Sequence, residues 1–96
     1  MKKVEYRGIK MNSNLENTIY SYEGNCYPLA TVINDFTEIT GDEEVQGLHT
    51  DTIFQSNTLD FKLDEDSWIN IEFEVIDKIK SNPIESMIKI NRVFIG

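Results

Sequence analysis

The chain has 96 residues, a formal net charge of −8 at pH 7, and a hydrophobic fraction of 40%. A chain of this length builds one core, so we expect a single domain over residues 1–96. The negative charge argues against a nucleic-acid-binding surface, because phosphate contacts need Lys and Arg. Fifteen acidic side chains and one base, Lys62, lie between residues 11 and 77. This excess favours a basic protein partner, a cation or a role in solubility alone.

The ends of the chain and its cysteine content favour the cytoplasm. The N-terminal sequence MKKVEYRG has no apolar run behind its lysines, so it does not resemble a secretory signal. No apolar stretch approaches the roughly 20 residues that cross a membrane. The single cysteine, Cys26, excludes an internal disulfide and a CxxC motif, which suits a reducing compartment.

Short β elements are predicted before the first proline. Residues 3–11 alternate around Gly8 and predict a strand with a bulge. Residues 12–17 are polar and predict a loop, and residues 18–23 predict a second strand. The turn pair Gly24-Asn25 then predicts a tight hairpin whose return strand covers residues 26–27.

A helix is predicted over about residues 28–40. Pro28 suits its first turn, and Gly41 stands where a left-handed C-terminal residue is expected. The apolar residues recur at helical spacing, namely Leu29, Val32, Ile33, Phe36 and Ile39.

The rest of the chain reads as strands and turns. After a charged loop at 42–44, residues 45–55 predict a strand, which a turn at 56–57 ends. Residues 59–77 alternate on both sides of a polar break and predict a β-hairpin. A last strand is expected over 87–95.

The register of the hairpin follows from its apolar face. With a loop at 64–68, Phe61 opposes Ile71 and the whole inner face is apolar. The inner residues are Leu59, Phe61, Leu63, Ile69, Ile71, Phe73 and Val75. The same register places Asp60 opposite Glu72 on the outer face, a like-charge pair that is destabilising.

Pairing of residues 69–77 with the last strand is predicted to relieve part of this charge. We expect Asp77 to face Lys89 and Glu74 to face Arg92. The second face of the sheet would then carry apolar residues that need a cover, namely Ile76, Ile88, Ile90 and Phe94.

These elements predict an α+β fold. We expect an antiparallel sheet of about six strands with one helix packed on one face. A parallel sheet is disfavoured because strands and helices do not alternate along the chain.

The sequence does not predict an enzyme, a metal site or a cofactor. His49 is the only histidine and could form a thiol triad with Cys26 and an acid such as Asp35, but no signature surrounds the cysteine. Acidic residues at 60 and 64–66 supply hard oxygen ligands, but their spacing is not that of a calcium-binding loop.

The function expected from these features is binding of a basic partner protein without catalysis. In size and charge alone, the chain resembles immunity proteins and phage-type inhibitors of nucleases, with carboxylates standing where phosphates would bind. The expected contact residues are Asp60, Asp64, Glu65, Asp66, Trp68, Glu72 and Glu74. Two alternatives are a structural module that self-associates through its sheet edges and a small-ligand-binding domain.

Overall fold

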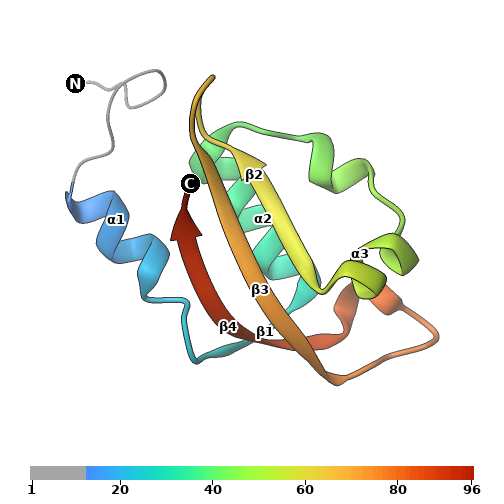
Figure 1. Cartoon of the computed structure of the whole chain (residues 1–96). Helices are drawn as coiled ribbons and strands as arrows, with labels where there is room; N and C mark the ends of the chain where they lie inside the picture. Colours follow the sequence, from blue (N-terminus) through green and yellow to red (C-terminus); the bar gives the residue numbers. More distant parts are fainter. Residues whose placement is uncertain (1–12) are drawn as a thin grey trace.

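The computed structural model describes residues 13–96 of the chain (Figure 1). These residues form an α+β fold with an antiparallel sheet of four strands, so the predicted count of about six strands is wrong. They also form three α-helices and two short 3-10 helices, where one helix was expected. The elements in chain order are α1 (Ser13–Tyr20), β1 (Cys26–Pro28), α2 (Leu29–Thr40), η1 (Glu44–Gly47), α3 (Thr50–Ser56), β2 (Thr58–Lys62), β3 (Trp68–Asp77), η2 (Pro83–Glu85) and β4 (Met87–Ile95).

Helix α2 confirms the helix predicted over residues 28–40 and begins one residue later. Pro28 is its N-cap, and Gly41 ends it at a φ of 79°, a left-handed conformation that glycine adopts without strain. The Gly41 N–H donates to the Thr37 carbonyl at 2.7 Å. Local sequence therefore sets both ends of the helix that covers the sheet.

The strand order in the sheet is β1-β4-β3-β2. The long strands β3 and β4 lie at the centre, and the short strands β1 and β2 form the two edges (Figure 1). The short strand predicted at residues 26–27 is present as β1, but it pairs with β4, where Tyr27 lies opposite Ile88.

Strands β2 and β3 form the predicted hairpin in a register that differs from the predicted one. Phe61 lies opposite Ile69 instead of Ile71, and the loop covers residues 63–67 instead of 64–68. Either register keeps the inner face apolar, because the shift is an even number of residues.

The corrected register removes the predicted clash of carboxylates on the outer face. Asp60 lies opposite Asn70, while Glu72 lies opposite Thr58. The expected pair of Asp60 with Glu72 is therefore wrong, and a destabilising like-charge contact is avoided.

The register between β3 and β4 also differs from the prediction. Arg92 lies opposite Glu72 instead of Glu74, and Lys89 lies opposite Glu74 instead of Asp77. Acidic and basic side chains still face each other across the two strands, so the expected relief of charge is present with different partners.

Two β-bulges explain this difference. Asn91 is an extra residue in β4 and Ile76 is an extra residue in β3, because the register shifts at both points. The bulge at Asn91 changes the parity of β4, so Ile88 and Ile90 are fully buried in the core rather than on the second face. Ile76 is 55% exposed, and Phe94 is half-buried.

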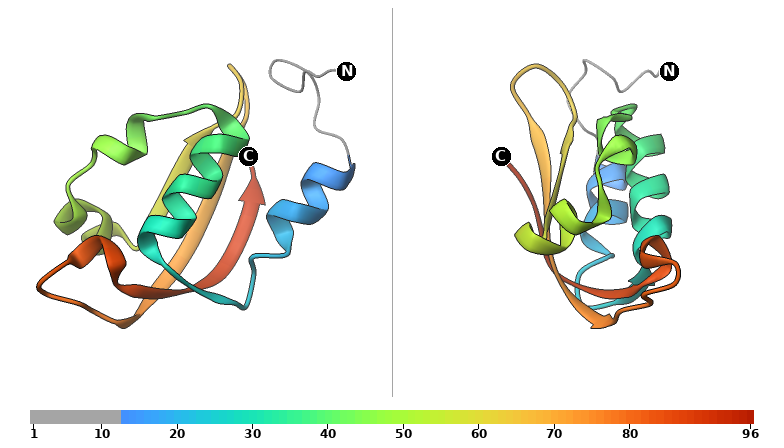
Figure 2. Two further views of the ribbon diagram at one scale, coloured as in Figure 1. Left: turned by 180° about the vertical axis from the view of Figure 1, so that it is seen from behind. Right: turned by 90° about the vertical axis from the view of Figure 1, so that its right-hand side faces the viewer.

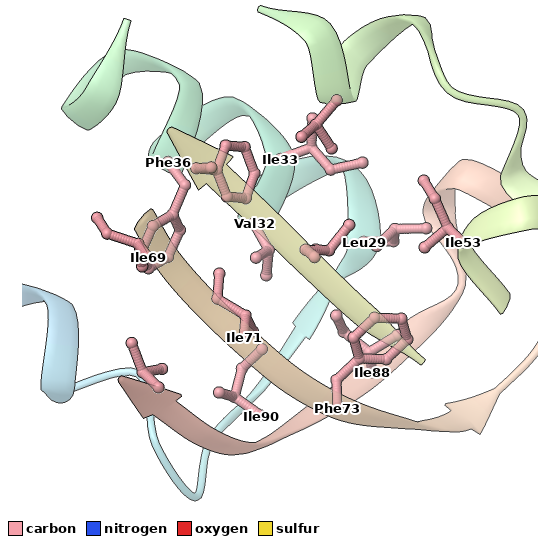
Figure 3. Close-up of a cluster of buried hydrophobic side chains, with 14 of the residues drawn as sticks. Leu29, Val32, Ile33, Phe36, Ile53, Ile69, Ile71, Phe73, Ile88 and Ile90 are labelled. Carbon is pink, nitrogen blue, oxygen red and sulfur yellow. The ribbon is translucent and has the colours of Figure 1, made fainter. Parts of the chain in front are cut away.

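Helices α1 and α2 lie on one side of the sheet, as the right-hand view of Figure 2 shows, whereas α3 lies at the β2 edge. Helix α2 packs its apolar face against the inner residues of β2, β3 and β4 (Figure 3). The core confirms the predicted inner face of the hairpin: five of its residues are buried, and Leu63 and Val75 are half-buried against them. The buried five are Leu59, Phe61, Ile69, Ile71 and Phe73.

Helix α1 replaces residues 13–17 of the predicted loop and the first half of the strand predicted at 18–23, whose remaining residues form a turn. Ile19 is fully buried and Leu15 packs against the same core, four residues earlier. This four-residue spacing is the helical signal, and the run of β-branched and aromatic residues that follows it masked that signal. The strand predicted at 3–11 lies outside the described residues.

The strand predicted at 45–55 is also wrong, because this segment forms η1 and α3. His49 is the N-cap of α3, and its Nδ1 accepts a hydrogen bond from the Asp51 N–H at 3.2 Å. Asn57, in the turn predicted at 56–57, ends the helix in the left-handed conformation. A seven-residue helix has too few turns to show a clear apolar period.

Candidate functional site

The seven residues predicted to bind a partner separate into two groups. Three lie on the outer face of the sheet, and four lie in or beside the β2–β3 turn. The outer-face residues are Asp60, Glu72 and Glu74. The turn residues are Asp64, Glu65, Asp66 and Trp68.

The charges of the outer face are balanced. Glu72 lies opposite Arg92 and Glu74 lies opposite Lys89, so two of its acids have a base across the strand. Asp60 and Lys62 lie two residues apart on β2 and share this face. Cross-strand pairs of opposite charge are stabilising. The outer face is therefore not a strongly negative surface.

A group of acids lies at one end of the molecule, where the β2–β3 turn and the C-terminal end of α2 lie together (Figure 1). Asp42 joins them: its Oδ2 accepts a hydrogen bond from the Lys62 N–H at 2.7 Å. Its Oδ1 accepts a second bond from the Glu44 N–H at 3.0 Å. One carboxylate thus holds the loop after α2 against the end of β2.

We call this region the acidic end and define it by six residues of two segments: Asp42, Glu43, Glu44, Asp64, Glu65 and Asp66. Glu43, Glu44, Glu65 and Asp66 are exposed. The two segments meet around an open hollow of about 390 Å³, and Lys62 is the base that lines it. Carboxylates gathered at a concave surface produce a negative potential that attracts cations.

The β2–β3 turn presents its carboxylates through local hydrogen bonds. The Asp64 Oδ1 accepts from the Asp66 N–H at 2.9 Å, an arrangement typical of an Asx turn. The Leu63 N–H donates to the Ser67 carbonyl at 2.9 Å and closes the loop. Glu65 is at the exposed tip as a result.

Sequence reasoning placed residues 42–44 in a charged loop and did not include them in the contact surface. They follow a helix C-terminus, whose dipole is also negative, so three acids there are locally unfavourable. Acids in a position that is unfavourable for the helix were the one sequence feature that could have pointed to a role for residues 42–44 in binding. The two segments are brought together by the hydrogen bond between Asp42 and Lys62, which lie 20 residues apart. No sequence pattern predicts a bond over that distance.

Aromatic side chains lie beside the acidic end on the outer face. Trp68 is 39% exposed and lies opposite Lys62. The Arg92 guanidinium lies 4.2 Å from the centre of the Phe94 ring, within the range of a cation–π contact. Trp68 therefore remains a candidate contact at the border of the acidic end.

The described residues do not form the thiol triad considered from the sequence. Cys26 lies in β1 and is exposed, whereas His49 caps α3, which contacts β2 at the opposite edge of the sheet. Within residues 13–96, no group of three or more His, Cys, Asp or Glu side chains has the geometry to hold a metal ion. In the same part of the chain, no helix has the length and apolar character that a membrane span requires.

The third residue of that set, Asp35, has a different partner. Its Oδ2 accepts a hydrogen bond from the Tyr22 hydroxyl at 2.7 Å. Burial, and then the bond to Asp35, raise the pKa of Tyr22 well above its ordinary value. Tyr22 also packs edge-on against Phe36 and at a tilt against Tyr27. The arrangement ties the segment after α1 to α2.

Comparison with protein-family models, with curated proteins and with solved structures found no match to this chain.

Proposed function

We propose that this protein is a non-enzymatic binding protein that recognises a basic protein partner through its acidic end. The observation that carries the proposal is the meeting of residues 42–44 and 64–66 around one lysine. The carboxylates of the outer face have bases opposite or beside them, whereas the acidic end gathers six acids beside one lysine.

The class of basic partner that we favour is a nuclease. A nuclease groove binds phosphates with Lys and Arg, and exposed carboxylates on a rigid surface present the same charge. Binding there would block the groove, as immunity proteins and phage-type inhibitors do. Complementary charge would also speed the encounter and make the association rate fall with salt. We place this role in the cytoplasm, where the exposed thiol of Cys26 stays reduced.

The proposal is tested with the full chain as bait in a native cell extract. We expect the bait to retain a basic protein at low salt and to release it as the salt concentration rises, because exposed charge pairs are screened. The retained protein is identified by mass spectrometry and its affinity is then measured with purified components. Replacing Glu43, Glu44 and Glu65 by lysine should abolish the interaction.

A matched triple variant separates the acidic end from overall charge. Glu16, Asp60 and Glu74 are also exposed, and replacing them by lysine changes the net charge by the same amount. We expect this variant to keep most of the affinity. Equal loss in both triple variants, or retention in both, would contradict the assignment to the acidic end.

A further inference from the structure

An apolar hollow lies next to the acidic end. It is bordered by α2, η1 and η2, which lie on the same side of the molecule in the left-hand view of Figure 2. Its apolar lining consists of Ala30, Ile33, Val45, Leu48 and Ile84. Ile33 and Val45 belong to the core, whereas Leu48 is 48% exposed. The hollow is thus a place where the core reaches the surface.

The backbone around Leu48 holds its side chain at the rim. Leu48 is the C-cap of η1 in an extended conformation, and its N–H donates to the Val45 carbonyl at 3.1 Å. Gln46 and Asn34 are joined across the hollow's edge by a side-chain hydrogen bond of 3.3 Å. The first bond closes the last turn of η1 and the second ties η1 to α2, so the rim is held by bonds within the free protein.

The size of the hollow favours one side chain over a free small molecule. Its volume is about 220 Å³, below the range of about 300–1,000 Å³ typical of small-molecule pockets. Interfaces obtain much of their affinity from one or two apolar anchors that enter such small pockets and exclude water.

The charges next to the hollow are negative. Glu43 and Glu44 precede Val45, and Glu85 follows Ile84, whereas no Lys or Arg lies within two residues of the seven that line the hollow. The segment from Gly41 to Leu48 borders the acidic end with its first residues and the hollow with its last. An occupant must therefore combine an apolar side chain with flanking positive charge.

We infer that the hollow receives an aliphatic side chain that basic residues flank in the partner's sequence, while those basic residues contact the acidic end. This inference rests on the proposed function and adds to it the chemistry of the recognised segment. The apolar anchor provides affinity and selects among basic proteins, which charge alone distinguishes poorly.

Two synthetic peptides provide the probe. One has a leucine between two pairs of lysines, and the other has a serine in place of the leucine, so both carry the same charge. The dissociation constants for the full chain are measured by titration of amide NMR signals. We expect the leucine peptide to bind about tenfold more tightly, because burying a leucine side chain is worth at least a factor of this order. The largest shifts are expected at Val45, Leu48 and Ile84.

Replacement of Leu48 by serine should remove most of the preference for leucine while leaving the salt dependence unchanged. Ile76→Ser is the matched control, because Ile76 is similarly exposed in a bulge of β3, and it should keep the preference. Circular dichroism checks that both variants fold.

The outcomes separate this inference from the proposed function. The anchor site is overturned if both peptides bind equally tightly, or if the Leu48→Ser variant still prefers the leucine peptide. In either case, binding that weakens with salt leaves the acidic end supported. The leucine peptide could also bind more tightly at every salt concentration and equally well to the triple lysine variant at Glu43, Glu44 and Glu65. This result supports the hollow as a binding site but overturns the acidic end. Absence of binding by either peptide counts against both.

Discussion

Tyr22 and Asp35 show how one hydrogen bond links two parts of the chain. The Tyr22 hydroxyl donates to the Asp35 carboxylate at 2.7 Å, and its ring rests on Phe36. The raised pKa of Tyr22 means that the folded protein favours its neutral form. The bond therefore stabilises the fold at any pH where the hydroxyl keeps its proton.

We expect Tyr22→Phe to lower the free energy of unfolding at pH 7 by about 1 kcal/mol, the usual net value of a hydrogen bond. Because the pKa is raised on folding, this contribution is fully present below the unfolded value, about 10, and falls as the pH rises towards the folded value. The gap between wild type and Tyr22→Phe should thus narrow above pH 10. Urea unfolding at several pH values measures it.

Tyr27→Phe is the control for this measurement. It also removes a tyrosine hydroxyl, and the Tyr27 ring packs against Tyr22, but the bond to Asp35 comes from the Tyr22 hydroxyl and is kept. A gap between wild type and Tyr22→Phe that is constant from pH 7 to the alkaline range would contradict the assignment of the bond. The role of Tyr22 could not be predicted from its sequence neighbourhood, which reads as an alternating strand.

Both edges of the sheet carry a side-chain carboxylate that occupies a backbone donor. On the β2 edge, Asp42 accepts from the Lys62 N–H at 2.7 Å. On the β4 side, beyond the end of β1, Glu23 accepts from the Val93 N–H at 2.7 Å. Free N–H groups at a sheet edge pair readily with strands of other molecules. These contacts favour binding through the acidic end over the alternative of self-association through sheet edges.

We therefore expect the double variant Glu23→Ala, Asp42→Ala to self-associate as its concentration rises, while the wild type does so less. Each replacement should also destabilise the fold by about 1 kcal/mol through the lost hydrogen bond. Light scattering across a concentration series measures the association. Asp60→Ala is the charge control on β2, because the pairing of Asp60 with Asn70 in the β2–β3 ladder is made by the backbone. Equal association in wild type and double variant would refute edge protection.

Elements with a strong local pattern were predictable, and short ones were not. Helix α2 has an apolar period over twelve residues and a glycine at its end, so its bounds follow from sequence. Helix α3 has seven residues and one buried side chain, Ile53, so packing on the sheet decides its structure. Helix α1 likewise depends on the burial of Ile19 against a core formed by later elements.

At the scale of the whole molecule, charge is distributed unevenly. The acidic end combines six carboxylates, while the outer face alternates acids with bases. Like charges held close together repel each other and oppose folding. The protein thus carries a local electrostatic cost that a binding partner of opposite charge would relieve.

This cost predicts that salt stabilises the free protein. We expect the melting temperature to rise by a few degrees between low and high NaCl concentration, equivalent to about 1 kcal/mol for a domain of this size. The lysine replacements at Glu43, Glu44 and Glu65 should reduce the salt dependence more than those at Glu16, Asp60 and Glu74. Calorimetry of the three proteins provides the measurement. The same salt dependence in all three would place the repulsion elsewhere.

Helix α2, the inner face of the hairpin and the extent of β4 could be predicted from the sequence, because each pattern lies within its own element. It also identified residues 64–66 as part of the candidate site. The strand register and the composition of the acidic end follow from contacts between distant parts of the chain. Two bulges set the pairing of β3 with β4, and a bond between Asp42 and Lys62 brings the loop after α2 to the hairpin turn. Such contacts join distant parts of the chain, so they depend on how the elements pack and not on any local period.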